Sequence, residues 1–274
     1  SLVAGPRRTS LASFTAMTTW TRALVTGASS GIGRSIAKRL AVDGTALVVV
    51  ARDTERLQAL AEGLPVNAEV LSADLATEKG RAAVADRIAS NDEPIDLVVN
   101  NAGLGFAGNL VDLKDADDRR TVDVNVVALH ELTRTAAKVF VERGGGAILN
   151  VSSVAGDLPG PGTATYSASK AFVTSLSEGL HAELRGTGVT VTALCPGLTR
   201  TEFQERAGVG DVEFPEFLWQ SPDEVAKVGL AAAKSGKAVV VAGAPNKVWS
   251  RVARSMPRTA MRELARITTS RRGR

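Results

Sequence analysis

The stretch that decides the fold is Thr26-Gly27-Ala28-Ser29-Ser30-Gly31-Ile32-Gly33, between the apolar segment Ala23–Thr26 and a helical pattern over Gly31–Val42. In such a strand-to-helix connection, glycines permit a tight turn, close approach of a pyrophosphate, and close packing of helix on strand. The helix N-terminus would also offer unpaired N–H groups to phosphate oxygens. The stretch therefore predicts a dinucleotide phosphate loop, although by itself it leaves a plain strand-to-helix turn open.

Farther along the chain, strand-like and helix-like segments continue to alternate. The later strands are predicted at Ala46–Ala51, Ala68–Ala73, Ile95–Val99, Ala147–Val151, Val189–Cys195 and Ala238–Val241. Helical patterns cover residues 54–62, 77–90, 115–143, 165–185 and 222–234. Since parallel strands need helical crossovers of one hand, this order predicts an α/β fold. We expect a single Rossmann-like, doubly wound domain, with helices on both faces of a parallel sheet of about seven strands.

The composition narrows the class of protein. Of 274 residues, 44% are hydrophobic and 23% are charged, which suits a globular core and argues against wholesale disorder. The single cysteine, Cys195, excludes an internal disulfide, and with only His130 and His181 beside it no metal site is predicted. No apolar run is long enough to span a membrane, and residues 1–20 show no secretory signal. We expect a cytoplasmic protein.

The charge is distributed unevenly along the chain. The net charge is +4, but residues 246–274 carry nine Lys/Arg and one acid, and residues 1–22 carry three arginines and no acid. The body is therefore acidic, and its few aromatic residues argue against nucleic-acid binding. We divide the chain into a mobile N-terminal extension (1–21), a dinucleotide-binding catalytic domain (22–245) and a basic tail (246–274).

The tail has a helical repeat of charge. Its arginines at 251, 254, 258, 262 and 266 recur every three or four residues, beside an apolar face. This pattern predicts a basic amphipathic helix, interrupted near Pro257. Such a helix could contact an anionic membrane surface as a peripheral element, or pack on the acidic body or on a second subunit. The sequence leaves these alternatives open.

The second strand ends at Val50-Ala51-Arg52-Asp53, where a dinucleotide fold recognises the adenosine ribose. A carboxylate at this tip binds the ribose 2′-OH of NAD, whereas an arginine suits the 2′-phosphate of NADP. Because position 51 is alanine and Arg52 follows it, NADP(H) is favoured over NAD(H). Three alternatives remain: Arg52 is merely solvated, Asp53 caps the next helix, or Asp53 binds the ribose and reverses the preference.

Tyr166 and Lys170 share one helix face, four residues apart. A lysine ammonium favours the phenolate and would lower the tyrosine pKa from about 10 toward the working pH, as acid/base catalysis requires. Ser153, at a strand end thirteen residues before Tyr166, could donate a hydrogen bond to a substrate carbonyl. Incidental residues on an amphipathic helix and an ordinary turn are the alternatives. The acid and basic residues of Asp115–Arg120 are expected to be a solvated helix start.

Together these motifs resemble a classical short-chain dehydrogenase/reductase over about residues 22–245. The matching motifs are Thr26–Gly33, Asn100-Asn101-Ala102-Gly103, Ser153 with Tyr166 and Lys170, and Cys195-Pro196-Gly197 with Thr201. The resemblance implies an oxidoreductase that interconverts a carbonyl and an alcohol, and it adds Asn125 as a fourth catalytic residue. Tyr166 would transfer the proton, Lys170 would lower its pKa and bind the nicotinamide ribose, and Ser153 would polarise the carbonyl. Asn125 would hold a water that links Lys170 to solvent.

The resemblance also implies the residues that bind the cofactor. They are Gly27, Ser29, Ser30, Gly31, Ile32, Gly33, Arg52, Asp74, Leu75, Asn101, Ala102, Gly103, Tyr166, Lys170, Pro196, Gly197, Thr199 and Thr201. Asp74 would meet the adenine, and Asn101 would line the cleft. Two positions depart from the family: Ser30 stands where many NADP(H)-preferring relatives have a basic residue, and Thr199 stands where the residue is usually aliphatic. The resemblance also implies a homodimer or homotetramer.

The segment 198–219, which covers the substrate in this family, is rich in apolar side chains. They are Leu198, Phe203, Val209, Val212, Phe214, Phe217, Leu218 and Trp219. An apolar lid that excludes water suggests an apolar small-molecule substrate, unless these residues pack on the body or on another subunit. The prediction is thus an NADP(H)-dependent oxidoreductase. The alternatives are an NAD-dependent secondary-alcohol dehydrogenase and a non-catalytic dinucleotide-binding scaffold or sensor.

Overall fold

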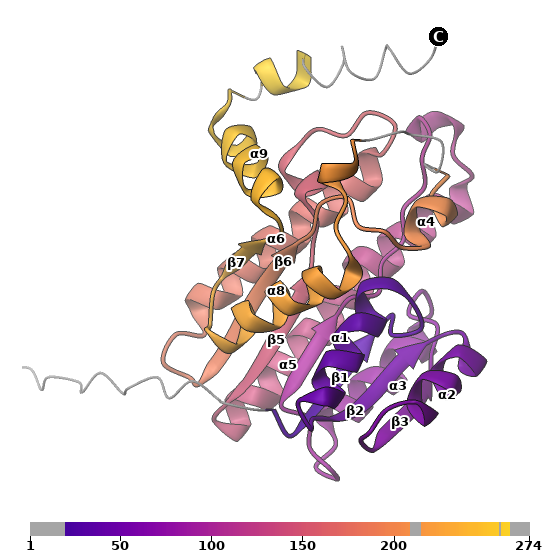
Figure 1. Cartoon of the computed structure of the whole chain (residues 1–274), viewed down its shortest axis with the longest axis vertical. Helices are drawn as coiled ribbons and strands as arrows, with labels where there is room; N and C mark the ends of the chain where they lie inside the picture. Colours follow the sequence, from indigo (N-terminus) through magenta and orange to yellow (C-terminus); the bar gives the residue numbers. More distant parts are fainter. Residues whose placement is uncertain (1–19, 209–214, 258, 264–274) are drawn as a thin grey trace, which may run out of the picture.

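The computed structural model describes residues 20–208, 215–257 and 259–263, and its strands form one parallel sheet (Figure 1). The strands are β1 (Arg22–Thr26), β2 (Ala46–Ala51), β3 (Ala68–Ser72), β4 (Leu97–Asn100), β5 (Gly146–Val151), β6 (Val189–Cys195) and β7 (Val239–Val241). Their order across the sheet is β3-β2-β1-β4-β5-β6-β7. Every predicted strand lies within two residues of an observed one, and the doubly wound parallel fold is confirmed.

Two layers of helices enclose the sheet. The helices are α1 (Gly31–Val42), α2 (Thr54–Glu62), α3 (Glu78–Ala89), α4 (Asp115–Val122), α5 (Leu129–Arg143), α6 (Ala164–Glu183), α7 (Phe203–Arg206), α8 (Pro222–Lys234) and α9 (Ala244–Ser255). Side chains of α1, α2 and α8 form one buried cluster with one face of the sheet, and side chains of α3 and α5 form a second cluster with the other face. Val25 belongs to the first cluster and its neighbour Leu24 to the second, as expected for a strand covered on both sides.

The helix predicted over residues 115–143 is not continuous. A π-helical turn, Asp123–Ala128, separates α4 from α5. Within this turn the side chain of Asn125 exchanges two hydrogen bonds with the backbone of Leu104: its Oδ1 accepts from the N–H (2.8 Å) and its Nδ2 donates to the C=O (2.7 Å). Turns of this kind occur often at functional sites. Hydrophobic spacing alone did not reveal it.

The fold places all the predicted motifs at one edge of the sheet. β1 pairs with β2 on one side and with β4 on the other, so the crevice between their carboxyl ends is the switch point where such sheets bind ligands. The segments that follow β4, β5 and β6 leave the same edge. Three of them contain short 3-10 helices, η1 (Leu110–Asp112), η3 (Val154–Asp157) and η4 (Glu216–Leu218). A ligand site is therefore expected at this edge of the sheet.

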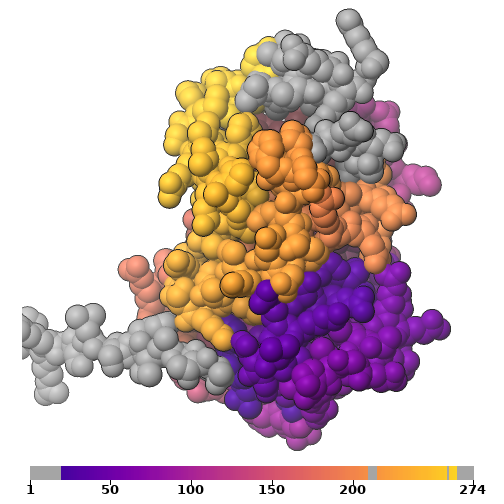
Figure 2. Space-filling view, viewed as in Figure 1, coloured from indigo at the N-terminus to yellow at the C-terminus, as the bar shows by residue number. Residues whose placement is uncertain are grey.

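The tail begins as the predicted amphipathic helix. α9 ends at Ser255, two residues before Pro257, and it buries Asn246, Ser250 and Ala253 while Trp249 remains exposed. The predicted boundary at 245/246 falls inside this helix, so α9 continues from the body. Its residues lie at the outer surface beside those that follow β6 (Figure 2). Residues 1–19 of the predicted extension (1–21), the lid residues 209–214, Arg258 and residues 264–274 lie outside the described residues.

Two features are absent from the described residues. Among them no helix combines the length and apolarity that crossing a membrane requires. Within the same ranges no three His, Cys, Asp or Glu side chains gather as a metal site would need.

Candidate active site

The glycine loop after β1, residues 27–33, packs closely against the residues that follow β4. A Cβ added to Gly33 would lie 2.3 Å from Asn101 Nδ2 and 2.4 Å from the carbonyl oxygen of Gly27. Gly27 itself has a positive φ of 65°, which permits the turn. The Asn101 amide donates to the carbonyl oxygens of Thr26 (2.9 Å) and Gly27 (3.2 Å). Asn101 therefore fixes the loop.

The open end of α1 fits a dinucleotide pyrophosphate. Ser30 occupies the N-cap position but forms no side-chain cap hydrogen bond, so no side chain caps the first turn. Gly31 at the first position has a φ of 54°, and a Cβ there would lie 2.9 Å from Thr201 Cγ2. The phosphate loop and the segment after β6 thus meet at a glycine. A cradle of this kind, at a helix N-terminus, suits an anionic phosphate group.

Arg52 and Asp53 separate into different roles at the tip of β2. Asp53 caps α2, since its Oδ1 accepts from the backbone N–H of Arg56 at 3.0 Å. The capping alternative is thus confirmed for Asp53. The Arg52 side chain is exposed, and none of the described residues gives its guanidinium a hydrogen bond or an ion pair. An exposed cation is therefore present at the tip of β2, where dinucleotide folds distinguish a ribose 2′-OH from a 2′-phosphate.

Asp74, predicted to meet the adenine, is anchored by an arginine that the sequence did not single out. Its Oδ2 accepts from Arg120 at 2.6 Å, and its Oδ1 accepts from the N–H of Ala76 at 3.0 Å. Burial raises the pKa of this carboxyl, but the hydrogen bonds from Arg120 and Ala76 outweigh burial and hold the pKa below its usual range. Arg120 belongs to the Asp115–Arg120 cluster, which was expected to be merely solvated. Neighbouring Leu75 is buried in the core.

Tyr166, Lys170 and Ser153 come together beneath the ends of β5 and β6. The Lys170 side chain is buried, its Nζ donates to the carbonyl oxygen of Val151 at 2.9 Å, and it lies 5.7 Å from the centre of the Tyr166 ring. Burial raises the pKa of the Tyr166 phenol, and a hydrogen bond with Ser153 opposes that rise. The predicted lowering of this pKa by Lys170 is not seen: burial dominates, and the opposing group is the serine. The arrangement places a phenol, a hydroxyl and an amine in one cluster.

Lys170 has a pKa of its own that is strongly altered. Burial lowers it from 10.5 to about 8. The single cysteine lies close by, and burial raises the pKa of the Cys195 thiol to about 11. Cys195 is therefore an unreactive strand end, as expected, whereas Lys170 can change charge near neutral pH. Groups so altered are common at functional sites.

This pKa gives the stability a dependence on pH whose sign can be tested. Between pH 8 and 10.5 the unfolded chain binds more protons at Lys170 than the folded chain, so this contribution to the free energy of unfolding rises with pH. A fall of the pKa from 10.5 to about 8 corresponds to about 3 kcal/mol in total. We expect the stability of the wild-type chain relative to Lys170→Met to increase from about pH 7.5 to about pH 10. Denaturant unfolding of both chains measures it, and a constant difference would contradict it.

Asn125 is buried next to the lysine. Besides its bonds to Leu104, its Nδ2 donates to Ser169 Oγ at 3.0 Å, which joins the π-helical turn to α6. Gly103 leaves the space between them, because a Cβ there would lie 3.3 Å from Lys170 Nζ and 3.6 Å from Asn125 Oδ1. The structure thus brings the predicted fourth residue to the site. Its role in holding a water stays a prediction.

The described part of the predicted lid reaches Tyr166 and the cofactor cradle. The ring of Phe203 lies 5.4 Å from that of Tyr166, and a Cβ on Gly105 would be 2.9 Å from both. Glu202 accepts from Arg56 of α2 at 2.8 and 3.0 Å, a contact the sequence gave no sign of. The unusual Thr199 is buried and donates to the carbonyl oxygen of Gly197 at 3.0 Å, so its hydroxyl is satisfied locally.

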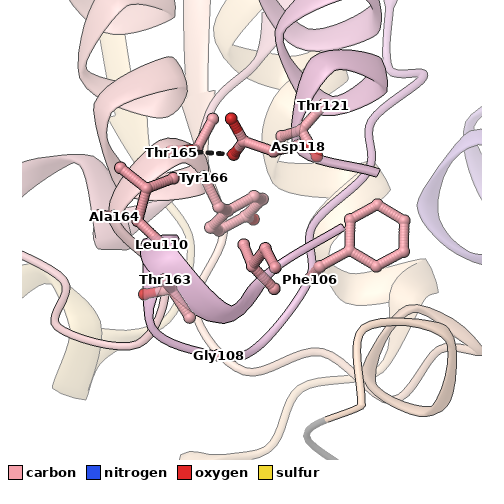
Figure 3. A pocket seen from close by; sticks show the side chains of 10 residues that line it. Phe106, Gly108, Leu110, Asp118, Thr121, Thr163, Ala164, Thr165 and Tyr166 are labelled. Atoms are coloured by element: carbon pink, nitrogen blue, oxygen red, sulfur yellow. Dashed lines mark hydrogen bonds between the residues drawn. The ribbon is translucent and has the colours of Figure 1, made fainter. Parts of the chain in front are cut away.

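A small pocket lies beside Tyr166 (Figure 3). Its lining is mainly apolar or uncharged: Phe106, Gly108, Leu110, Leu113, Asp118, Thr121, Thr163, Ala164, Thr165 and Tyr166. The one charged group, Asp118, accepts a 2.5 Å hydrogen bond from Thr165. The loop after β4 and the start of α6 therefore give the phenol an apolar neighbour. No pattern in the sequence had pointed to Phe106 or Leu110.

Comparisons with known proteins agree with this arrangement. Residues 21–210 match the family described as short chain dehydrogenase. A protein of Chromohalobacter salexigens named sulfoacetaldehyde reductase 2 is 41% identical over 201 residues, which cover 72% of this chain and 80% of the relative. A short-chain dehydrogenase from Sphingobium yanoikuyae, solved in complex with NADPH, is 40% identical with a TM-score of 0.75, covering 80% of this chain and 87% of that one.

A third comparison concerns a ketone-specific enzyme. The bulky-bulky ketone specific alcohol dehydrogenase from Comamonas testosteroni is 34% identical with a TM-score of 0.75, and the match covers 86% of this chain and 91% of that one. The glycine cradle, the cluster of Tyr166 with Lys170 and Ser153, and these matches lead to one conclusion. The chain belongs to the short-chain dehydrogenase family, and it is an NAD(P)-dependent oxidoreductase that acts on alcohol or carbonyl groups.

Proposed function

We propose that this protein is an NADP(H)-dependent oxidoreductase that interconverts a carbonyl and an alcohol on an apolar small molecule, with Tyr166 as the acid/base. The observation that carries the proposal is the cluster of the partly buried Tyr166 and Ser153 with the buried Lys170, at the same sheet edge as the glycine cradle. When bound, the nicotinamide supplies or accepts the hydride. Tyr166 would give a proton to the substrate oxygen in reduction and take it back in oxidation.

The other side chains would prepare the phenol and the substrate for this proton transfer. Ser153 hydrogen-bonds to Tyr166 and would donate to the substrate oxygen as negative charge develops there. Lys170 would bind the nicotinamide ribose. Phe203 covers the ring of Tyr166 and would exclude water from the reacting atoms. Asn125 would hold the water through which Lys170 exchanges protons with solvent.

An apolar, uncharged substrate is favoured by the side chains around Tyr166. Phe106, Leu110 and Phe203 lie beside the phenol. The arginines of the described lid are already paired, Arg200 with Glu216 and Arg206 with Glu202. These pairs leave no arginine of the described lid to bind an anionic substrate. Ketones, aldehydes and alcohols of graded chain length, and sulfoacetaldehyde as the anionic comparison, would be assayed at 340 nm with both cofactors.

Arg52 makes the cofactor preference testable. We expect Arg52→Ala to raise the KM for NADPH roughly tenfold or more while changing the KM for NADH less than about twofold, since a charge-assisted hydrogen bond contributes about 1.5–3 kcal/mol. Arg185→Ala removes an equally exposed charge at the far end of α6 and serves as the control. An NAD preference in the wild type, with no effect of Arg52→Ala, would favour the NAD-dependent alternative.

Two expectations on assembly and location stay predictions. Formation of a homodimer or homotetramer is testable by light scattering of the purified protein. Peripheral membrane contact through 246–274 concerns the outer face of α9, where Val248, Trp249 and Val252 are exposed. Its inner face packs on the body instead, so the tail is at least in part an element of the domain.

A further inference from the structure

The helix α9 packs against a turn that borders the proposed site. Near its N-terminus the Asn246 side chain donates to the carbonyl oxygen of Ala242 at 2.9 Å. A Cβ added to Gly197 would lie only 2.2 Å from Asn246 Nδ2, so the amide is pressed against the Pro196–Gly197 turn. α9 is therefore in contact with a segment that the resemblance assigns to the cofactor.

α9 also holds a second segment, through residues that lie one turn and two turns after Asn246. Asp157 accepts a hydrogen bond at each carboxylate oxygen, from Arg254 Nε at 2.9 Å and from Ser250 Oγ at 2.6 Å. The Asp157 side chain is only 9% exposed, and Ser250 is buried. A carboxylate so far removed from water depends on its partners. Among the described residues, both hydrogen-bond partners of this carboxylate come from α9.

Asp157 is the last residue of η3, and η3 starts immediately after Ser153. The Ser153 Oγ accepts from the N–H of Ala155 at 3.1 Å, so the orientation of the serine depends on this turn. On its other side η3 touches α6: a Cβ on Gly156 would lie 2.7 Å from the backbone of Lys170 and of Ala171. The four residues of η3 are thus held between α9 and the backbone of α6 at the lysine.

We propose that Arg254 and Ser250 are positioning residues for catalysis: through Asp157 they hold η3, and with it the Ser153 hydroxyl, in place at Tyr166. The inference rests on the proposed function, in which Ser153 orients the substrate oxygen. Without these contacts η3 keeps its packing on α6 and the hydrogen bond from the Val154 N–H to the carbonyl oxygen of Pro196 at 3.0 Å. The end of η3 at Asp157 loses both of its ties to α9, and the position of the serine becomes less fixed. A misplacement of about 1 Å near the reacting atoms can cost roughly a hundredfold in rate.

The test compares four variants of the full chain. Arg254→Ala and Ser250→Ala each remove one partner of Asp157, and Arg251→Ala removes an exposed arginine of the same helix for which the described residues provide no partner. We expect the first two to lower kcat for a ketone or alcohol roughly tenfold. The KM for the nucleotide should stay within about twofold, and Arg254→Lys should recover most of the rate. Arg251→Ala should match the wild type.

The single cysteine supplies a readout that needs no turnover. Cys195 is buried, and it lies close enough to Asp157 and Arg254 to feel their charges. We expect its reaction with an aromatic disulfide reagent to be several-fold faster in Ser250→Ala and Arg254→Ala than in Arg251→Ala, because η3 and α9 loosen around it. Loss of Arg254 alone would raise the thiol pKa and slow the reaction, so an acceleration can only come from exposure.

The outcomes separate this inference from the proposed function. Rates and thiol reactivity equal to those of Arg251→Ala would overturn the positioning role. A lower kcat with unchanged thiol reactivity would overturn it as well, since that result assigns Arg254 or Ser250 a direct contact with substrate. A wild-type chain that binds NADPH but reduces none of the carbonyls would instead refute the proposed function, and the thiol measurement would still report the docking of α9.

Discussion

The Tyr166→Phe variant should lose roughly a thousandfold of kcat while its dissociation constant for NADPH stays within about twofold of the wild type. The change removes only the phenol oxygen, which is the proposed proton donor. The ring remains to pack against Phe203 and Gly105, so the site keeps its shape. Initial rates at 340 nm give kcat, and quenching of protein fluorescence by the nucleotide gives the affinity.

A second substitution makes this prediction sharper. Ser153→Ala should lower kcat roughly a hundredfold, less than Tyr166→Phe, because it removes a hydrogen bond to the developing charge and leaves the acid in place. Turnover that persists in Tyr166→Phe would refute the acid/base assignment. A wild-type chain that binds nucleotide but shows no turnover with any substrate would favour the scaffold or sensor alternative.

Gly33→Ala is expected to have a large effect on both stability and nucleotide binding. Gly33 is helical, so alanine would be accepted by the backbone, but its Cβ would lie 2.3 Å from Asn101 Nδ2 and 2.4 Å from the carbonyl oxygen of Gly27. Both neighbours belong to the hydrogen-bonded turn and have little freedom to move. We expect a loss of about 2–4 kcal/mol in the free energy of unfolding, as overpacking against fixed atoms costs. NADPH affinity should fall at least roughly tenfold, since the phosphate cradle is distorted.

Gly179 provides the matched control for this change. It also lies within a helix, α6, and a Cβ there would meet nothing within 4 Å. Gly179→Ala should leave nucleotide affinity unchanged and stabilise the chain by about 0.5–1 kcal/mol, because alanine loses less backbone entropy than glycine in a helix. Urea unfolding and nucleotide titration of both variants measure the contrast. Equal behaviour of the two alanine variants would show that the close approach at Gly33 is unimportant.

Local sequence patterns predicted the succession of the strands along the chain and their bounds well. Continuous apolar runs such as Ala46–Ala51 could only be strands buried on both faces, and the structure has them there. The structural roles of the glycines within residues 26–33 were predictable for the same reason. Each glycine is required by its own turn or by the packing of the next helix. These features depend on neighbours in the chain, and therefore the sequence shows them directly.

The Tyr166 pKa depended on the tertiary structure. The spacing of Tyr166 and Lys170 on α6 was readable, but it suggested that the lysine sets the pKa of the phenol. In the fold, Lys170 donates to Val151, and burial with Ser153 determines that pKa instead. Desolvation is a property of everything packed around a group, and no spacing within one helix reports it.

The amino-acid sequence by itself determined the doubly wound sheet and the glycine loop, and it singled out the candidate catalytic side chains, because local periodicity and residue spacing encode them. Only the tertiary structure decided that Arg120 anchors Asp74, that a π-helical turn carries Asn125, and that α9 holds the turn after Ser153. The hydrogen bonds of Asp74, Asn125 and Asp157 that belong to these features join residues between 21 and 97 positions apart in the chain. Such pairs meet only when the packing of the whole domain brings them together, and α9, which the sequence assigned to a separate tail, thereby contacts the turn after Ser153.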